Sequence, residues 1–308
     1  MSNKWLIVVA GPTAVGKTAL CVRLAQDLAT AVVSADSRQL YRELNIGTAK
    51  PTPEEMQGVR HYFIDSHRML EPVSAGQYER EALAVLDRLF QETDRVILSG
   101  GTGLYINAVC FGLDDVPQAD PILRTELMNR LDTEGLEPLQ HQLRALDPVY
   151  AETADLQNTQ RVIRALEVVL SSGKPYSSFR RQETDGPASR PFRTVFIALD
   201  RPRDELYDRI DRRMDNMLAQ GLVEEARSLL PYRHLTPLQT VGYKEVFGYL
   251  DGAYDAEEMV RLLKRNSRRY AKRQLTWFRH QGDYQWFAAE DYEAIERYIQ
   301  TATGHNQP

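Results

Sequence analysis

The first hundred residues alternate short apolar runs with amphipathic stretches. The apolar runs at 6–10, 31–34 and 96–99 have the length of buried strands, and the stretches at 18–28 and 77–90 have the apolar periodicity of helices. Strands that alternate with helices in this way are typical of a parallel sheet covered by helices. The pattern therefore predicts an α/β core.

The pattern changes near residue 112. Strand-like runs stop there, and helical stretches follow one another at 121–131, 138–146 and 159–171 before a turn-rich segment at 184–191. We interpret this region as a mostly helical insertion into the α/β core.

A strand-like run at 194–199 resumes the core, and helices are expected at 203–230, 242–250 and 256–279. The last residues are polar, which is typical of a frayed end. The predicted division is a core of 1–113 and 192–300 that includes C-terminal helices, an inserted helical domain of 114–191, and a flexible tail of 301–308.

Composition limits the class of protein. The chain has 308 residues, of which 43% are apolar and 26% charged, with a net charge of −5, as in ordinary globular proteins. Its apolar runs are far shorter than the roughly 20 residues that span a bilayer. Cys21 and Cys110 lie among apolar neighbours, so we expect buried thiols and no disulfide. We expect a cytoplasmic monomer that does not use a membrane.

A phosphate-binding loop follows the first apolar run. The pattern G-x-x-x-x-G-K-[ST] lets backbone amides face phosphate oxygens, adds a lysine charge, and offers a hydroxyl to Mg²⁺. The helix expected after it would favour anions at its N-terminus. This nucleotide- or pyrophosphate-binding loop comprises Gly11, Pro12, Thr13, Ala14, Val15, Gly16, Lys17 and Thr18, and Thr18 is the expected Mg²⁺ ligand.

Two further polar residues follow predicted strands. Asp36 comes after the run at 31–34, and Thr102 lies between glycines after the run at 96–99. Ligands of open parallel sheets bind beyond the carboxyl ends of the strands, so both residues are expected beside the loop. Asp36 either caps a turn or acts as a catalytic carboxylate, and its position favours catalysis. For Thr102, a phosphate contact and a structural loop hydroxyl stay equally open.

One expected feature of ATP-hydrolysing proteins is missing. Their phosphate loops are accompanied by an Asp at the end of an apolar strand that organises Mg²⁺, whereas here the run at 96–98 continues into Ser99 and Gly100. This difference favours a site that holds pyrophosphate as a leaving group over one that transfers a γ-phosphoryl group.

The predicted helix at 256–279 has a basic face. No acidic residue occurs between Arg261 and Arg279, so a solvated face, the alternative interpretation, would lack its usual interspersed carboxylates. Nucleic-acid phosphates are the partner that such a face fits. Its members are Arg261, Lys264, Arg265, Arg268, Arg269, Lys272 and Arg273.

A second basic cluster lies in the predicted helix at 203–230. Arg209 and Arg213 are four residues apart and share a helix face. Asp208, Asp211 and Asp215 lie close enough in the sequence to pair with them, so the pattern alone favours surface ion pairs.

Seven motifs occur in order along nearly the whole chain: GPTAVGKT at 11–18, SADSRQLY at 34–41, NIGTAKP at 45–51, GGTGLY at 100–105, NTQRVIRALEV at 158–168, VGYKE at 241–245 and KRQLTWFR at 272–279. Together they resemble the bacterial tRNA dimethylallyltransferase family. The resemblance implies a P-loop NTPase-like core and Mg²⁺-dependent transfer of a dimethylallyl group from its pyrophosphate to N6 of adenosine 37, 3′ to the anticodon of tRNA.

The resemblance also implies roles for particular residues. Asp36 would be the general base, and Lys17, Thr18, Thr102 and Arg213 would stabilise the leaving pyrophosphate. The residues expected to contact the anticodon stem loop of tRNA are Asp36, Ser37, Arg38, Gln39, Thr102, Arg124, Gln160, Arg161, Val162, Ile163, Arg164, Tyr243, Lys244, Lys272, Arg273, Gln274 and Arg279.

Two other functions fit parts of the sequence. A prenyltransferase of free adenine nucleotides would share the phosphate loop and an Asp, but it has no use for a basic helix. A P-loop small-molecule kinase would explain the loop, but the missing strand-end Asp counts against it.

Overall fold

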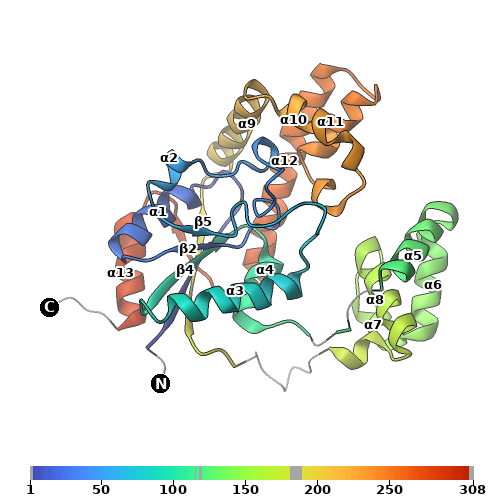
Figure 1. The fold of residues 1–308 in the computed structure, drawn as a ribbon, viewed down its shortest axis with the longest axis horizontal. Coiled ribbons are helices and arrows are strands. Elements are labelled where there is room, and N and C mark those ends of the chain that lie inside the picture. The colour runs from blue at the N-terminus through green and yellow to red at the C-terminus, as the bar shows by residue number, and fades with distance from the viewer. Residues whose placement is uncertain (1–2, 115, 118–119, 181–188, 305–308) are drawn as a thin grey trace. The chain divides into compact units, whose positions relative to one another are not determined.

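The structure, a computed structural model, describes residues 3–114, 116–117, 120–180 and 189–304. It consists of two compact units (Figure 1). The core unit comprises Met1–Phe111 and Ser189–Pro308, and the inserted unit comprises Gly112–Ala188. The inserted unit begins and ends slightly earlier in the chain than the predicted insertion of 114–191. We describe each unit by itself.

The core unit contains a parallel sheet with the strand order β3-β2-β4-β1-β5-β6, which confirms the predicted α/β class. Four strands lie at the predicted places, whereas β3 and β6 are too short or too exposed to give a strand pattern. The strands are β1 (Trp5–Ala10), β2 (Val32–Ser34), β3 (His61–Tyr62), β4 (Arg95–Gly100), β5 (Arg193–Asp200) and β6 (Gln285–Ala288).

Helices cover both faces of this sheet because its central strands are apolar on both sides. Along β1, Leu6 and Val8 belong to the hydrophobic cluster that includes residues of α3 and α4. Ile7 and Val9 belong to the cluster that includes residues of α1 and α13. These helices are α1 (Lys17–Asp27), α3 (Ala75–Leu89), α4 (Gly103–Phe111) and α13 (Tyr292–Thr303).

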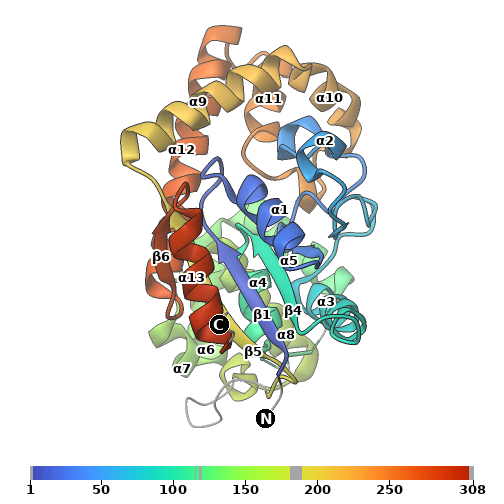
Figure 2. The same cartoon turned by 90° about the vertical axis from the view of Figure 1, so that its left-hand side faces the viewer.

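A second group of helices gathers beyond the carboxyl ends of β1, β4 and β5 (Figure 2). The prediction of a single helix at 203–230 is wrong. The chain turns at Gly221, which has a φ of 101°, and a second helix begins after it. α4 and α13 lie where no helix was predicted. The last residues of α13 are the first residues of the tail expected at 301–308. Residues 305–308 lie outside the described residues. The group comprises α9 (Arg203–Ala219), α10 (Leu222–Leu229), α11 (Tyr243–Leu250) and α12 (Ala256–His280), and a short α2 (Pro53–Met56) follows β2.

The inserted unit is helical. Leu127, Leu139, Val162 and Ile163 are each at most 1% exposed and form its hydrophobic core. Across the described ranges of both units, no helix is long and apolar enough to cross a membrane. The helices of the inserted unit are α5 (Pro121–Glu134), α6 (Leu136–Leu146), α7 (Pro148–Thr153) and α8 (Thr159–Ser172).

Candidate active site

A cavity of about 1030 Å³ opens in the core unit, lined by residues that follow β1, β2 and β4 and by residues of α9 and α12. Lys17, Thr18, Asp36 and Arg213 all line it. The sheet therefore brings these predicted residues to one place, because the turns after parallel strands meet at one edge.

Backbone geometry and the Lys17 side chain determine the conformation of the phosphate loop. Gly16 has a φ of 118°, a conformation that favours glycine, and it leads directly into α1. The Lys17 ammonium donates to the carbonyl oxygens of Gly11 at 2.9 Å and Pro12 at 2.7 Å. Burial lowers the pKa of Lys17 to about 8; the nearby Asp36 carboxylate opposes this shift and the Arg213 guanidinium adds to it.

Three arginines contact successive residues of the phosphate loop. Arg201 Nε donates to the Val15 carbonyl oxygen at 2.7 Å, and Arg209 Nε donates to the Ala14 carbonyl oxygen at 2.8 Å. Arg213 Nη1 donates to the Thr13 hydroxyl at 3.0 Å. Sequence reasoning missed Arg201 and Arg209.

The surface ion pairs favoured for Arg209 and Arg213 are wrong. Arg212, between them, pairs with Asp208, and Asp211 and Asp215 have partners on α12. Arg213 is oriented inward, and burial lowers its pKa while Asp36 opposes the shift. Its Nε is buried and has no partner among the described residues. A buried guanidinium with an unused donor beside a phosphate loop can bind an anion.

Asp36 caps a turn, which was one of the two interpretations of its sequence position. Its Oδ1 accepts from the backbone N–H groups of Arg38 at 2.9 Å and Gln39 at 3.2 Å, so it caps the turn after β2. Within the described part of the chain no hydrogen bond reaches Oδ2. The carboxylate is thus held in place by one oxygen while the other can accept a proton.

Thr102 joins two turns. Its hydroxyl accepts from the Ser37 backbone N–H at 3.1 Å and lies 3.3 Å from the Ser37 hydroxyl. Its own backbone N–H donates to the Ala35 carbonyl oxygen at 3.1 Å. These contacts are those of a structural loop hydroxyl, and they fix the turn that carries Asp36.

Segment 45–50, part of the NIGTAKP motif, forms one wall of the cavity. The Glu225 carboxylate accepts from the backbone N–H groups of Asn45, Ile46 and Gly47 at 2.9–3.0 Å and from the Tyr243 hydroxyl at 2.7 Å. A Cβ at Gly47 would lie 2.6 Å from the Tyr243 ring, so this position needs glycine. Tyr243 is fully buried and supports the segment, which corrects its expected contact with tRNA.

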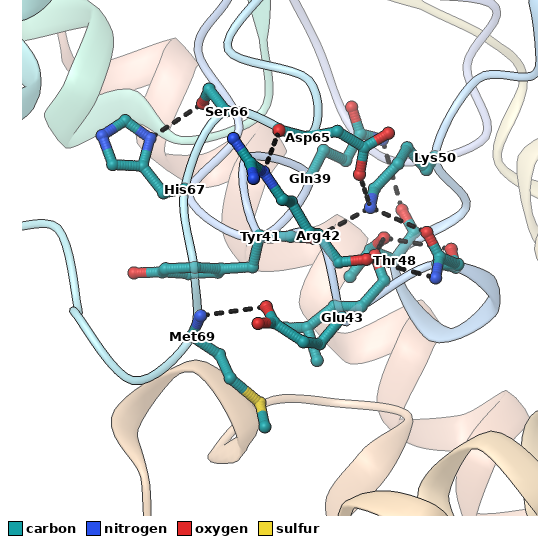
Figure 3. A network of polar contacts seen from close by, with 12 residues as sticks. Gln39, Tyr41, Arg42, Glu43, Thr48, Lys50, Asp65, Ser66, His67 and Met69 are labelled. Atoms are coloured by element: carbon teal, nitrogen blue, oxygen red, sulfur yellow. Dashed lines mark hydrogen bonds and ion pairs between the residues drawn. The ribbon is translucent and has the colours of Figure 1, made fainter.

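Lys50, at the C-terminal end of the same segment, holds it in place through hydrogen bonds (Figure 3). Its ammonium donates to the Tyr41 carbonyl oxygen, to Asn45 Oδ1 at 2.9 Å and to Asp65 Oδ1 at 2.5 Å. Gln39 Nε2 donates to the carbonyl oxygens of Thr48 and Ala49 at 3.2 and 3.1 Å. These contacts hold the segment, which includes a short 3-10 helix at Ile46–Thr48, against the site.

The basic face of α12 is partly neutralised by carboxylates that lie outside the stretch from Arg261 to Arg279. Arg261 pairs with Glu258 on the same helix at 2.6 Å. Lys264 pairs with Asp215 at 2.7 Å and Arg268 with Asp211 at 2.5 Å, both on α9. Arg279 pairs with Asp200 at 3.0 Å. Arg269, Lys272 and Arg273 are exposed, as is Lys244 on α11, and none of these four has an ion pair among the described residues.

Gln274 lies on the opposite face of α12 from these cations. Its side chain is 7% exposed, and its amide hydrogen-bonds to Thr13 and Gly101. The structure therefore does not place Gln274 where it could contact tRNA, because its polar atoms are used inside the core unit.

In the inserted unit, most of the residues expected to contact tRNA are engaged internally. Arg124 and Arg164 contact the fully buried Glu167 carboxylate at 2.8 and 3.3 Å. Arg124 also donates to Gln160 at 2.9 Å. Val162 and Ile163 are 0% exposed and belong to the core, which corrects their assignment to an RNA surface. Gln160 and Arg161 are exposed, and of the two only the Arg161 side chain has no hydrogen bond or ion pair within the described ranges.

The fold and the cavity define a class: α/β proteins with a P-loop-type phosphate site that arginines from outside the loop contact. A family model described as IPP transferase matches residues 39–281. The chain therefore belongs to the IPP transferase family, as its motifs indicated.

Individual relatives agree with this assignment. The chain is 54% identical over 298 residues to the tRNA dimethylallyltransferase of Cytophaga hutchinsonii, covering 97% of each chain. It is 47% identical over 302 residues to tRNA dimethylallyltransferase 1 of Bacteroides fragilis, covering 98% of this chain and 99% of the relative.

Solved structures show the same similarity. The tRNA isopentenylpyrophosphate transferase of Bacillus halodurans is 41% identical with a TM-score of 0.69, over 97% of this chain and 96% of that one. A eukaryotic dimethylallyltransferase acting on tRNA is 25% identical with a TM-score of 0.79, over 98% of this chain and 80% of that one.

Proposed function

We propose that this enzyme transfers a dimethylallyl group from dimethylallyl pyrophosphate to N6 of adenosine 37 in tRNA. The observation that carries the proposal is that a phosphate loop, three arginines of α9 and Asp36 line one cavity. A phosphate loop and arginines suit a pyrophosphate, and a carboxylate beside them suits a proton acceptor. The relatives' names supply the acceptor, tRNA.

In the proposed reaction the N6 nitrogen forms a bond to C1 of the dimethylallyl group while the bond from C1 to the pyrophosphate oxygen breaks. The N6 proton passes to Oδ2 of Asp36, the oxygen that the turn leaves unused. Lys17, Arg209 and Arg213 stabilise the charge that develops on the departing pyrophosphate.

Mg²⁺ fits this site through oxygen donors. Thr18 lies in the first turn of α1 and, like Asp36, lines the cavity. A hydroxyl and a carboxylate, completed by pyrophosphate oxygens and water, are ligands that Mg²⁺ accepts, and the described residues contain no cluster of three His, Cys, Asp or Glu for a different metal. When bound, Mg²⁺ would neutralise charge on the pyrophosphate.

We propose that tRNA binds through the exposed cations of α12, Arg269, Lys272 and Arg273, together with Lys244, and that Arg161 contributes from the inserted unit. The target base would leave its stack to reach Asp36, where Ser37, Arg38 and Gln39 surround it. Because one chain lines the whole cavity, we propose a monomer. We also propose that it acts in the cytoplasm, where its proposed tRNA substrate is found.

One experiment tests the proposed function against its alternatives. The protein is incubated with Mg²⁺, dimethylallyl pyrophosphate and either an anticodon stem loop or adenosine monophosphate. The masses of the products are then measured by mass spectrometry. We expect the RNA alone to gain one C₅H₈ group. A gain only on the monophosphate would indicate a prenyltransferase of free nucleotides. No gain on either, with hydrolysis of added ATP, would indicate a kinase.

Replacing Asp36 tests the general base. Asp36→Asn keeps the turn-capping oxygen but cannot accept the proton, so turnover should fall about 10²- to 10⁴-fold while RNA affinity is retained. Single-turnover kinetics with the stem loop measure the first quantity, and filter binding measures the second. Unchanged turnover would remove Asp36 from this role.

A further inference from the structure

Gln274 lies on the helix of the proposed RNA surface but faces away from that surface. It follows the exposed residues Lys272 and Arg273 in α12, yet its own side chain is 7% exposed. Burial of a side-chain amide is costly unless its donor and acceptor are both satisfied. The hydrogen-bond partners of the Gln274 side chain therefore indicate its role.

Both ends of the Gln274 amide are used. Oε1 accepts from the Thr13 backbone N–H at 2.9 Å, and Nε2 donates to the Gly101 carbonyl oxygen at 2.9 Å. Thr13 belongs to the phosphate loop after β1, and Gly101 belongs to the turn after β4. One side chain thus joins the two loops that border the cavity.

The glycines of the GGTG turn provide a second, independent observation. A Cβ at Gly101 would lie 2.3 Å from Gln274 Nε2, and a Cβ at Gly103 would lie 1.9 Å from Trp277 Nε1. Neither position can carry a side chain unless Gln274 or Trp277 of α12 shifts. The turn after β4 is therefore shaped to receive this face of α12.

Thr13 connects Gln274 to the proposed catalytic machinery. Its backbone N–H is held by Gln274, and its hydroxyl accepts from Arg213 Nη1 at 3.0 Å. A displacement of Thr13 would move both the phosphate loop and the guanidinium that binds beside it.

We propose that Gln274 is a positioning residue, which sets Thr13, and through it Arg213 and the phosphate loop, for the pyrophosphate of the donor. It makes no contact with RNA. This inference rests on the proposed function for the identity of the donor, but the arrangement would serve any pyrophosphate ligand.

The first test compares two substitutions of the same kind on opposite faces of α12. Gln274→Met removes both hydrogen bonds at similar volume, and Lys272→Met removes one exposed charge. We expect Gln274→Met to weaken binding of inorganic pyrophosphate with Mg²⁺ about tenfold and to lower transfer on the order of 100-fold, with unchanged affinity for the stem loop. Lys272→Met should show the reverse: weaker RNA binding and unchanged pyrophosphate binding.

The second test uses pH to restore the contacts. In Gln274→Glu the introduced carboxyl, when protonated, can again donate to Gly101 and accept from Thr13, but when ionised it places a charge against a carbonyl oxygen. The ratio of variant to wild-type kcat/KM for the donor should therefore rise as the pH falls. A substitution that only disturbed folding would give no such recovery.

These measurements separate the inference from the proposed function. If wild-type protein binds pyrophosphate but modifies no RNA, the proposed function fails, and the pyrophosphate affinity of Gln274→Met still decides the inference. The inference is overturned if Gln274→Met binds pyrophosphate like wild type, if it loses RNA affinity as Lys272→Met does, or if the Gln274→Glu ratio does not depend on pH.

Discussion

Helices α9 and α12 both carry arginines that alternate with aspartates or polar residues, yet their charges serve different purposes. On α9, Arg209 and Arg213 contact the phosphate loop. On α12 the cations turn outward, and two of them are neutralised by Asp211 and Asp215 of α9. Asp211 and Asp215 therefore do not pair with Arg209 or Arg213 of their own helix.

The difference shows that nearness in the sequence is a poor guide to which charges pair. Asp211 lies two residues from both Arg209 and Arg213, but residues two apart on a helix point to different sides. Arg268 on α12 lies 57 residues away and reaches Asp211 at 2.5 Å. The packing of α9 against α12 decides the pairing.

The largest expected effect comes from removing an inward charge of α9. Arg213→Met should lower kcat/KM for the donor about 10²- to 10³-fold, because Arg213 is buried beside the leaving group, while RNA affinity is retained. Steady-state kinetics with varied donor measure this. Arg203→Met is the matched control: Arg203 is exposed at the start of α9, lies over the Tyr207 ring and is not among the residues that line the cavity, so we expect little change. An equal loss of kcat/KM in both variants would show that the two positions on α9 do not differ in function.

The next effect is a pH dependence at Lys17. Burial lowers its pKa to about 8, so its charged form is present below that pH and is lost as the pH rises through it. Affinity of the free protein for inorganic pyrophosphate should fall by up to about tenfold per pH unit above 8. Titration calorimetry at several pH values measures this. Lys17→Arg keeps its charge, so its affinity should not vary in this way; a parallel fall would exclude Lys17 as the cause.

A smaller effect is expected on the outward face of α12. Replacing Arg269 and Lys272 together with Ala should weaken stem-loop binding and flatten the dependence of log Kd on log salt by roughly one unit for each lost phosphate contact. Replacing Arg261 and Arg268, which are paired with carboxylates, should flatten it less. Equal slopes for the two double variants would mean that pairing does not distinguish these cations.

The smallest effect is expected from breaking one ion pair between the helices. Asp211→Asn leaves Arg268 without its carboxylate, and because both side chains are about a third exposed the loss of stability should be at most about 1 kcal/mol. RNA binding at low salt should become slightly tighter, since one more cation is available. Denaturant unfolding and filter binding measure the two changes. Weaker RNA binding would show that the pair orients Arg268 for RNA.

Local patterns predicted much of the fold and part of the site. The phosphate loop, the strands around it and Asp36 were recognised because each depends on backbone geometry within about ten residues. β3 and β6 were missed because strands of two and four residues carry too little pattern. Val162, Ile163 and Tyr243 were assigned to RNA although they are buried, because a motif does not reveal which of its residues face the core.

The sequence by itself determined that a strand, a phosphate loop and a helix follow one another, and that an acidic residue comes after the next strand. Only the tertiary structure decided which charges are free and which are paired, and that Gln274, 261 residues from Thr13, holds the phosphate loop. The physical reason is range. Turns and helices form from neighbouring residues, whereas ion pairs and buried hydrogen bonds form between side chains that only the packing of distant elements brings together.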